Sequence, residues 1–261
     1  NRGLGGRRWR LLLSVMGNPL PVFMHGDLLI AIALLASAYV QGLSGVGFSL
    51  IAAPAIAQTI PGAGAIGLVN LLALSQNCFM LWRENGRIQW AVVRRLLAGL
   101  VAGVMLGLLL SHVMANQWRP FVVAASSLAS LLALVLWKPK GRRGAATISA
   151  LWSGTVNSYA GVGGPPLAAY LVHIDLDQGD YIRTQQFCFA FLNIASIPFL
   201  GLPSISIPWL LGAVAVIVAG TILGRWTRRF FSPSRAHQTT IIVIALVALA
   251  ALIRSLVDLL T

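Results

Sequence analysis

The sequence predicts an all-α protein that crosses a membrane several times. Of its 261 residues, 57% are hydrophobic and only 10% are charged, and the mean hydropathy is +0.82. A soluble domain of this length needs far more charge on its surface. The basic residues lie in short runs between apolar stretches, as in the cytoplasmic loops of membrane proteins. No basic surface studded with aromatic residues stands apart from these stretches, so nucleic-acid binding is not expected.

Eight apolar stretches follow one another along the chain. Six have the length of one membrane crossing, but the first and the fifth are 30 residues or longer. A continuous helix of that size would measure about 45–50 Å, against a hydrocarbon core of about 30 Å. Each of these two stretches is therefore predicted to form two helical arms with a break at a glycine cluster. The stretches cover residues 27–60, 62–82, 91–113, 119–137, 145–174, 182–200, 207–224 and 239–257.

The two glycine clusters belong to an internal repeat with an offset of 116 residues, because Gly45-Val46-Gly47 falls on Gly161-Val162-Gly163. At the same offset the amide of Gln41 falls on the amide of Asn157. We therefore expect four parts along the chain. They are a basic N-terminal segment at 1–26, a first transmembrane repeat at 27–137, a basic cytoplasmic linker at 138–144 and a second transmembrane repeat at 145–261.

Positive charge changes loops between the two repeats. The loop at 83–95 carries four arginines and its equivalent near 201–208 carries none, whereas 112–119 carries one and its equivalent at 225–235 carries four. If basic loops face the cytoplasm, equivalent loops face opposite sides, which indicates an inverted-topology repeat. Each half would then hold one helical hairpin broken at a Gly-rich turn plus three transmembrane helices. Eight crossings in two parallel halves are the alternative, which the Arg-rich N-terminus favours.

Each break offers the chemistry of an anion site. Irregular backbone survives inside a bilayer only where it is buried in protein or lines a polar cavity. The helix after each break begins with free N–H groups and with the positive end of its dipole. Two breaks at matching positions therefore predict a transport site near the middle of the membrane. No charged side chain stands near either break, so we expect neutral groups that bind an oxyanion and also release it.

The candidate substrate-binding residues come from both breaks and from the helices that follow them. In the first half they are Gln41, Ser44, Gly45, Gly47, Ser49 and Asn77. In the second half they are Asn157, Ser158, Tyr159, Gly161, Gly163, Gly164, Pro165 and Asn193. A single buried amide more often serves helix–helix hydrogen bonding. Asn77 and Asn193 are included because they correspond across the repeat.

Two charged residues are candidates for other steps of transport. Asp27 is the only acid at the start of an apolar stretch, which makes it a candidate proton site, although an Asp there also suits a helix N-cap. Arg183 opens a later helix and is a candidate for attracting anions at a vestibule, although an interfacial arginine also reaches toward the headgroups. No residue pattern indicates a metal site or another cofactor.

A serine protease is the alternative that Gly42-Leu43-Ser44-Gly45 raises, because this run matches the G-x-S-G pattern of rhomboid-type intramembrane proteases. Such an enzyme needs a histidine within hydrogen-bond reach of the serine inside the membrane. All four histidines lie at segment ends or in loops, and Ala160 occupies the equivalent of Ser44. We therefore expect a transporter rather than an enzyme. A scaffold or assembly protein would gain nothing from broken helices.

The run Gly161-Val162-Gly163-Gly164-Pro165-Pro166-Leu167, the paired breaks and the duplicated halves resemble the TauE/SafE sulfite exporter family over about residues 27–258. The resemblance implies a transporter of the bacterial inner membrane that exports sulfite, sulfoacetate, thiosulfate or a similar anion. Another small carboxylate or inorganic anion is the alternative substrate. Candidate coupling ions are H+ and Na+, and a homodimer is a candidate assembly. Phe48 and Ser49 stand where the second half has Gly164 and Pro165, so the two breaks are not expected to contact substrate equally.

Overall fold

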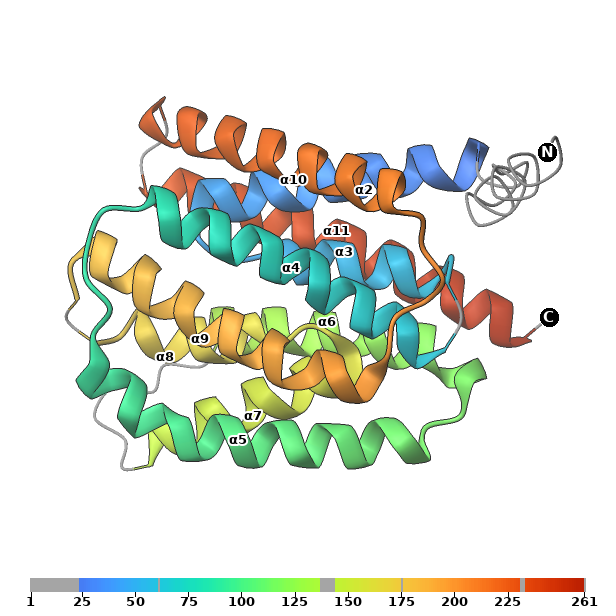
Figure 1. The fold of residues 1–261 in the computed structure, drawn as a ribbon, viewed down its shortest axis with the longest axis horizontal. Helices are drawn as coiled ribbons and strands as arrows, with labels where there is room; N and C mark the ends of the chain where they lie inside the picture. Colours follow the sequence, from blue (N-terminus) through green and yellow to red (C-terminus); the bar gives the residue numbers. More distant parts are fainter. Residues whose placement is uncertain (1–23, 61, 137–143, 175, 231–232, 261) are drawn as a thin grey trace, which may run out of the picture.

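The computed structural model describes residues 24–60, 62–136, 144–174, 176–230 and 233–260, and within them the chain is helical, without strands (Figure 1). This confirms the all-α class. The first half contains α2 (Met24–Ser44), α3 (Phe48–Ala57), α4 (Ala63–Arg83), α5 (Trp90–Val113), η1 (Asn116–Trp118) and α6 (Arg119–Leu136). The second half contains α7 (Ala145–Ala160), α8 (Gly164–Leu171), α9 (Gln178–Leu200), α10 (Ile207–Thr227), η2 (Arg228–Phe230) and α11 (Pro233–Leu260). The predicted basic segments at 1–26 and 138–144 fall almost entirely outside the described residues.

Several helices have the length and surface of membrane spans. Four helical segments of the described chain are long and apolar enough to cross a bilayer, namely α4, α5, η1 with α6, and α10 with η2. α9 is not among them because Arg183, Gln185 and Gln186 lower its hydropathy. Large apolar side chains face outward along α5 and α10, for example Leu109 and Leu211, each 64% exposed. Such a surface suits lipid rather than water, so the chain is a multi-pass membrane protein.

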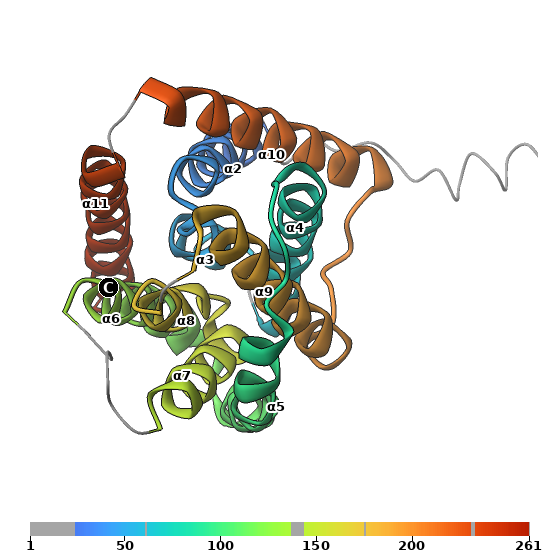
Figure 2. The ribbon, with the colours of Figure 1, turned by 90° about the vertical axis from the view of Figure 1, so that its left-hand side faces the viewer.

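The short helices α3 and α8 lie in the core of the bundle. Every residue from Gly164 to Ala169 is buried, and Phe48, Leu50 and Ile51 are at most 1% exposed. Figure 2 shows the other helices arranged around this pair. A bilayer would therefore contact neither short helix directly.

The chain leaves the preceding helix through a positive-φ glycine before both short helices, although the last turn residues differ, with φ of 125° at Gly47 and −70° at Gly163. α2 ends at Ser44 and α7 ends at Ala160, and in each case the next helix begins after three intervening residues. Gly45 and Gly161, which correspond at the offset of 116, have positive φ angles of 85° and 75°. This left-handed conformation is open to glycine without a steric penalty. Equivalent glycines therefore redirect the backbone in the two halves.

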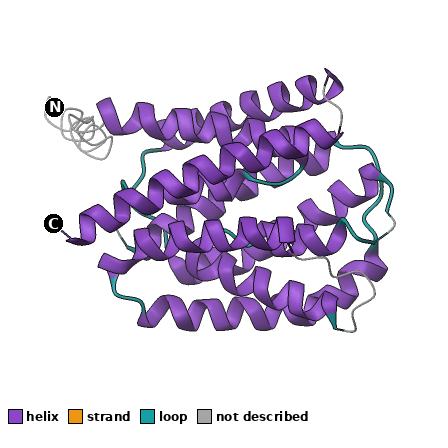
Figure 3. Ribbon diagram, turned by 180° about the vertical axis from the view of Figure 1, so that it is seen from behind, coloured by secondary structure: helices purple, strands orange, loops and turns teal. Residues whose placement is uncertain are grey.

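Each half packs its fourth helix against the first arm of the other half. α5 lies along α7, and α10 lies along α2 (Figures 1 and 2). Glycines permit this close approach, since a Cβ on Gly103 would collide with the carbonyl oxygen of Leu151, and one on Gly224 with that of Tyr39. The third helices, α4 and α9, contact each other in the interior. Seen from behind, the described elements form a single bundle joined by short loops (Figure 3).

Candidate functional site

Both breaks contribute to one small cavity inside the bundle. Its volume is about 20 Å³, which holds about one water molecule. Seven of the fourteen predicted substrate-binding residues line it, namely Gln41, Gly47, Ser49, Asn77, Asn157, Gly164 and Asn193. The apolar part of the wall consists of Val46, Phe48, Ala73 and Phe189. No charged residue is part of this wall, so its electrostatic character comes from amides, one hydroxyl and backbone groups.

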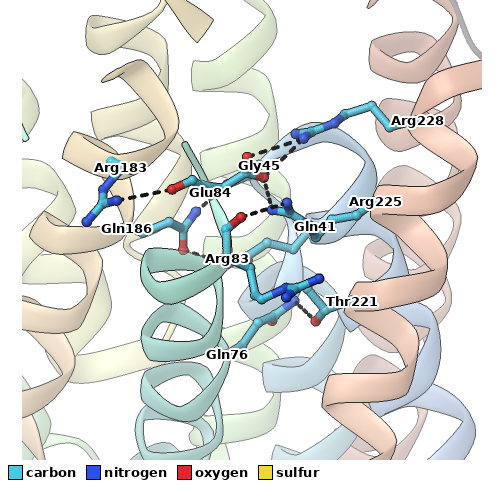
Figure 4. A network of polar contacts seen from close by, with 10 residues as sticks. All are labelled: Gln41, Gly45, Gln76, Arg83, Glu84, Arg183, Gln186, Thr221, Arg225 and Arg228. Carbon is cyan, nitrogen blue, oxygen red and sulfur yellow. Dashed lines mark hydrogen bonds and ion pairs between the residues drawn. The ribbon is translucent and has the colours of Figure 1, made fainter. Parts of the chain in front are cut away.

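At the first break, the buried side chain of Gln41 holds three partners. Its Oε1 accepts the backbone N–H of Phe48 at 3.0 Å, and its Nε2 donates to Asn77 Oδ1 at 3.2 Å and to Gln186 Oε1 at 3.1 Å. Gln186 in turn donates from Nε2 to the carbonyl oxygen of Gly45 at 2.9 Å (Figure 4). Glutamine side chains therefore bond both the first N–H of α3 and a carbonyl of the turn before it.

At the second break, Asn157 occupies the position of Gln41. Its Nδ2 lies 3.4 Å from Asn193 Oδ1 and 3.5 Å from Ser196 Oγ. The Asn157–Asn193 pair thus repeats the Gln41–Asn77 pair, with the same separation of 36 residues. However, no side chain in the described part of the chain accepts the N–H of Gly164, and Gly163 before it provides no cap. The Gly164 N–H at the start of α8 is therefore not bonded by a described side chain, whereas the equivalent Phe48 N–H of α3 is bonded to Gln41.

Asn70 occupies in α4 the position that Gln186 occupies 116 residues later in α9. It is 0% exposed, yet within the described part of the chain neither its Oδ1 nor its Nδ2 has a hydrogen-bond partner. The neighbouring Val69 side chain lies against the second break, where a Cβ on Gly161 would meet it at 3.2 Å. Leaving a buried polar group unpaired costs about 1–3 kcal/mol, so such a residue calls for a functional reason. Neither Asn70 nor Gln186 is in the predicted set, although their shared offset could have identified both.

Ser44 stabilises the turn rather than the cavity. Its Oγ lies 2.9 Å from the carbonyl oxygen of Val40 and 2.8 Å from that of Val46, and it accepts the N–H of Val46 at 3.4 Å. Within the described residues, no hydrogen bond joins Ser44 to a histidine. The hydroxyl therefore closes the end of α2, which is a structural use of a serine at this position.

Two more predicted hydroxyl groups, those of Ser158 and Tyr159, also bond outside the cavity. Ser158 Oγ lies 2.8 Å from Ser196 Oγ on α9, and Tyr159 OH lies 2.9 Å from Ser126 Oγ on α6. These contacts join α7 to its neighbours. The remaining predicted residues shape the turns without lining the cavity, and they are Gly45, Gly161, Gly163 and Pro165.

The two predicted charged residues lie away from the cavity. α2 begins at Met24, so Asp27 falls inside its first turn rather than at its start, and the Asp27 side chain is outside the described part. Arg183 does not open α9, which begins at Gln178. Its Nη1 donates to the backbone oxygen of Glu84 at 3.1 Å (Figure 4). Arg183 therefore ties α9 to the end of α4.

Glu84 joins the two halves at one end of the bundle. Its carboxylate is 7% exposed and forms ion pairs with Arg225 and with Arg228, the second at 3.1 Å (Figure 4). Arg225 also donates to the backbone oxygen of Arg83 at 3.0 Å. The basic loop at 83–95 and the described arginines at the end of α10 consequently lie together at the same end of the molecule.

Asp180 makes a second connection at this end, before the apolar part of α9. Its carboxylate accepts the backbone N–H of Arg87 at 2.7 Å and a hydrogen bond from the Gln89 side chain. The Arg87 N–H, followed by the Gln89 amide, lowers the pKa of the Asp180 carboxyl below its usual value. The loop after α4 is therefore held to the second half by two acids.

The fold and the cavity define a class of protein, a multi-pass helical membrane protein in which two broken helices meet at a buried polar cavity, as in membrane transporters. A family model described as "Sulfite exporter TauE/SafE" matches residues 29–252, and the chain belongs to this family. The resemblance drawn from the Gly161–Leu167 run is thereby confirmed. No match was found among curated proteins or among solved structures.

Proposed function

We propose that this protein is a secondary transporter that exports small sulfur-containing oxyanions, such as sulfite or sulfoacetate, across a bacterial inner membrane. The observation that carries the proposal is the cavity between the two breaks, whose polar wall consists of neutral groups. Amide and backbone N–H donors bind an oxyanion without the full strength of a charge pair, so the anion can also leave. Membership of the sulfite exporter family supplies the sulfur chemistry and the direction.

We also propose that residues 27–137 and 145–261 form an inverted-topology repeat. In support, Figure 1 draws α2 entering from the end near the N label and α7 from the opposite end. The packing of α5 on α7 mirrors that of α10 on α2. The Glu84 ion pairs hold the loop at 83–95 next to Arg225 and Arg228, whereas eight crossings in parallel halves would separate these basic regions by the membrane.

The size of the cavity suggests how such a transporter would work. A cavity of about 20 Å³ is smaller than an oxyanion, so the two halves must separate to admit one. Rocking of one half against the other would open the site to each side in turn. An interior-negative membrane potential favours export of an anion by about 2.3 kcal/mol per charge per 100 mV. Export is therefore favourable without coupling, and coupling through Asp27 to H+ is the alternative.

The test is a flux measurement with the purified protein in liposomes. Sulfite, sulfoacetate, thiosulfate, sulfate and acetate are loaded one at a time, and an interior-negative potential is set with a K+ gradient and valinomycin. We expect efflux of at least one sulfur-containing anion to be faster than efflux of acetate and to increase with the potential. Liposomes that contain the same anion but no protein give the background rate.

The same assay separates the alternative substrates and couplings. If acetate leaves faster than every sulfur-containing anion, the substrate is another small anion. If no sulfur-containing anion leaves faster than the background, the proposal is wrong. Collapsing the H+ or the Na+ gradient separately then identifies a coupling ion, and unchanged efflux in both cases supports uncoupled export.

A further inference from the structure

A second polar site lies on the outer surface of the bundle, at the end of α10. A pocket of about 250 Å³ is lined by Arg83, Arg225, Arg228 and Arg229 together with Ile222 and Trp226. No acid is part of its lining. Glu84 lies behind the pocket and pairs with two of the four arginines, so the cluster keeps a net charge of +3 (four arginines minus one carboxylate).

Glu84 holds two of the pocket arginines in place, but not all of the arginine N–H donors have partners among the described residues. Nη2 of Arg228 bonds to Glu84 at 3.1 Å, whereas its Nη1 is buried and has no hydrogen-bond partner among the described residues. Arg83 and Arg229 are exposed, and the Arg83 guanidinium lies over the Trp82 ring at 5.4 Å. An unpaired guanidinium nitrogen is costly, and the oxygens of a phosphate satisfy several such donors at once.

The surroundings of the pocket are those of a membrane–water interface. Trp226 packs edge-on against Phe230 at 5.1 Å, and Trp82 is 74% exposed. Aromatic residues at the ends of membrane helices mark the level of the lipid headgroups. Below the arginines, Ile222 is 51% exposed. Of the four candidate spans, the one formed by α10 has the smallest share of buried residues, 28%. The pocket therefore joins a cationic rim to an apolar, lipid-facing wall.

We infer that this pocket binds the phosphate group of an anionic phospholipid. Free phosphate or another soluble oxyanion would supply the same acceptor oxygens but would leave Ile222 and Trp226 uncovered. A lipid covers both with its glycerol and acyl portion while the arginines bind its phosphate. Because Arg225 and Arg228 also hold Glu84, the bound lipid stabilises the junction between the two halves. This inference does not depend on the proposed substrate.

The direct test uses the full chain in detergent, titrated with phosphatidylglycerol or phosphatidylcholine and followed by native mass spectrometry. The variant Arg83→Gln/Arg229→Gln removes two exposed pocket arginines and keeps the Glu84 ion pairs. The control, Arg94→Gln/Arg95→Gln, removes the same charge from exposed positions that do not line the pocket. At about fivefold per arginine near the membrane surface, the pocket variant should bind phosphatidylglycerol about thirtyfold more weakly. The control should match the parent protein.

Competition distinguishes the lipid from a soluble anion. Inorganic phosphate and glycerol phosphate, added at millimolar concentrations, should leave phosphatidylglycerol bound. Displacement of the lipid by either at concentrations equal to the lipid would assign the pocket to a free oxyanion and overturn the inference. Equal retention of phosphatidylcholine, or equal affinities in the pocket variant and its control, would overturn it as well. Melting temperatures of both variants verify that each remains folded.

Discussion

The two breaks share a positive-φ glycine, Gly45 or Gly161, but they differ in the residue before the short helix, where φ is 125° at Gly47 and −70° at Gly163, and in the side chains around them. At the first break the amides are glutamines, Gln41 and Gln186, and both reach backbone groups of the turn. At the second break the equivalent residues are asparagines, Asn157 and Asn70, each one methylene shorter. Asn157 bonds to other side chains, and Asn70 bonds to none. The second break thus combines shorter amides at two positions with a different backbone at Gly163, and its first helical N–H is not bonded by a described side chain.

This difference suggests a division of labour within the proposed transporter. At the first break the Phe48 N–H is bonded to Gln41 and the Gly45 carbonyl is bonded to Gln186, so these groups hold the turn in place. The second break leaves the N–H of Gly164 for a ligand, at the positive end of α8. We therefore expect the substrate oxyanion to bind mainly at the second break.

Replacing Gln41 should have the largest effect on stability. Gln41→Ala removes the partner of three buried groups, the Phe48 N–H, Asn77 Oδ1 and Gln186 Oε1, at about 1–3 kcal/mol each, so the loss should exceed about 3 kcal/mol. Thermal melting in detergent measures it. Asn157→Ala is the matched control, because its bonds of 3.4 and 3.5 Å are weak, and it should cost about 1 kcal/mol. Equal melting temperatures for the two variants would remove the distinction between the breaks.

Sulfite binding should depend on Asn157, at the second break. Asn157→Ala removes a donor from the cavity wall and should weaken sulfite binding about tenfold, the value of roughly one hydrogen bond to a charged group. Isothermal titration calorimetry gives the dissociation constant. Ser158→Ala changes the adjacent residue, which does not line the cavity, and should keep the affinity of the parent protein. Weaker binding in the Ser158 variant alone would move the site away from Asn157.

Asn70 and Gln186 should respond to leucine in opposite directions. Asn70→Leu removes two buried atoms without a described partner, so the melting temperature should stay the same or rise, equivalent to about 1 kcal/mol. Gln186→Leu breaks bonds to Gln41 and Gly45 and should lower the melting temperature. If Asn70→Leu destabilises the protein as much as Gln186→Leu, the amide of Asn70 is structural.

The smallest effect is expected at Ser44. Ser44→Ala removes hydrogen bonds to carbonyls at the end of α2, and alanine is the residue that the second half already has at this place, Ala160. Stability should fall by about 1 kcal/mol or less, and sulfite flux should be unchanged. Loss of sulfite flux in a folded Ser44→Ala protein would show that this hydroxyl takes part in transport.

The architecture was largely accessible from the sequence. Apolar stretches of 30 residues or more are too long for one crossing, and their glycine clusters lie where α2 and α7 end. A positive φ at Gly45 and Gly161 is a local backbone requirement, which a sequence records directly as glycine. The repeat offset also aligned residues that now line one cavity.

The side-chain network was not accessible in the same way. Whether an amide at position 41 or 157 reaches a backbone N–H depends on one methylene and on the rotation of its helix, which composition and spacing do not record. The ion pair of Glu84 with Arg225 joins residues that are 141 positions apart. The hydrogen bond of Arg183 to the Glu84 carbonyl likewise joins residues that are far apart in the sequence. Such contacts follow from the tertiary packing of α4, α9 and α10.

The most direct test of the central claim is to locate the anion. Selenite, the heavier analogue of sulfite, scatters anomalously, so a crystal of the protein grown in its presence would reveal the selenium position. We expect a selenium peak placed so that the selenite oxygens accept hydrogen bonds from the Gly164 N–H and from Asn157 Nδ2. A peak beside the Phe48 N–H, or peaks confined to the arginine pocket at the end of α10, would contradict it.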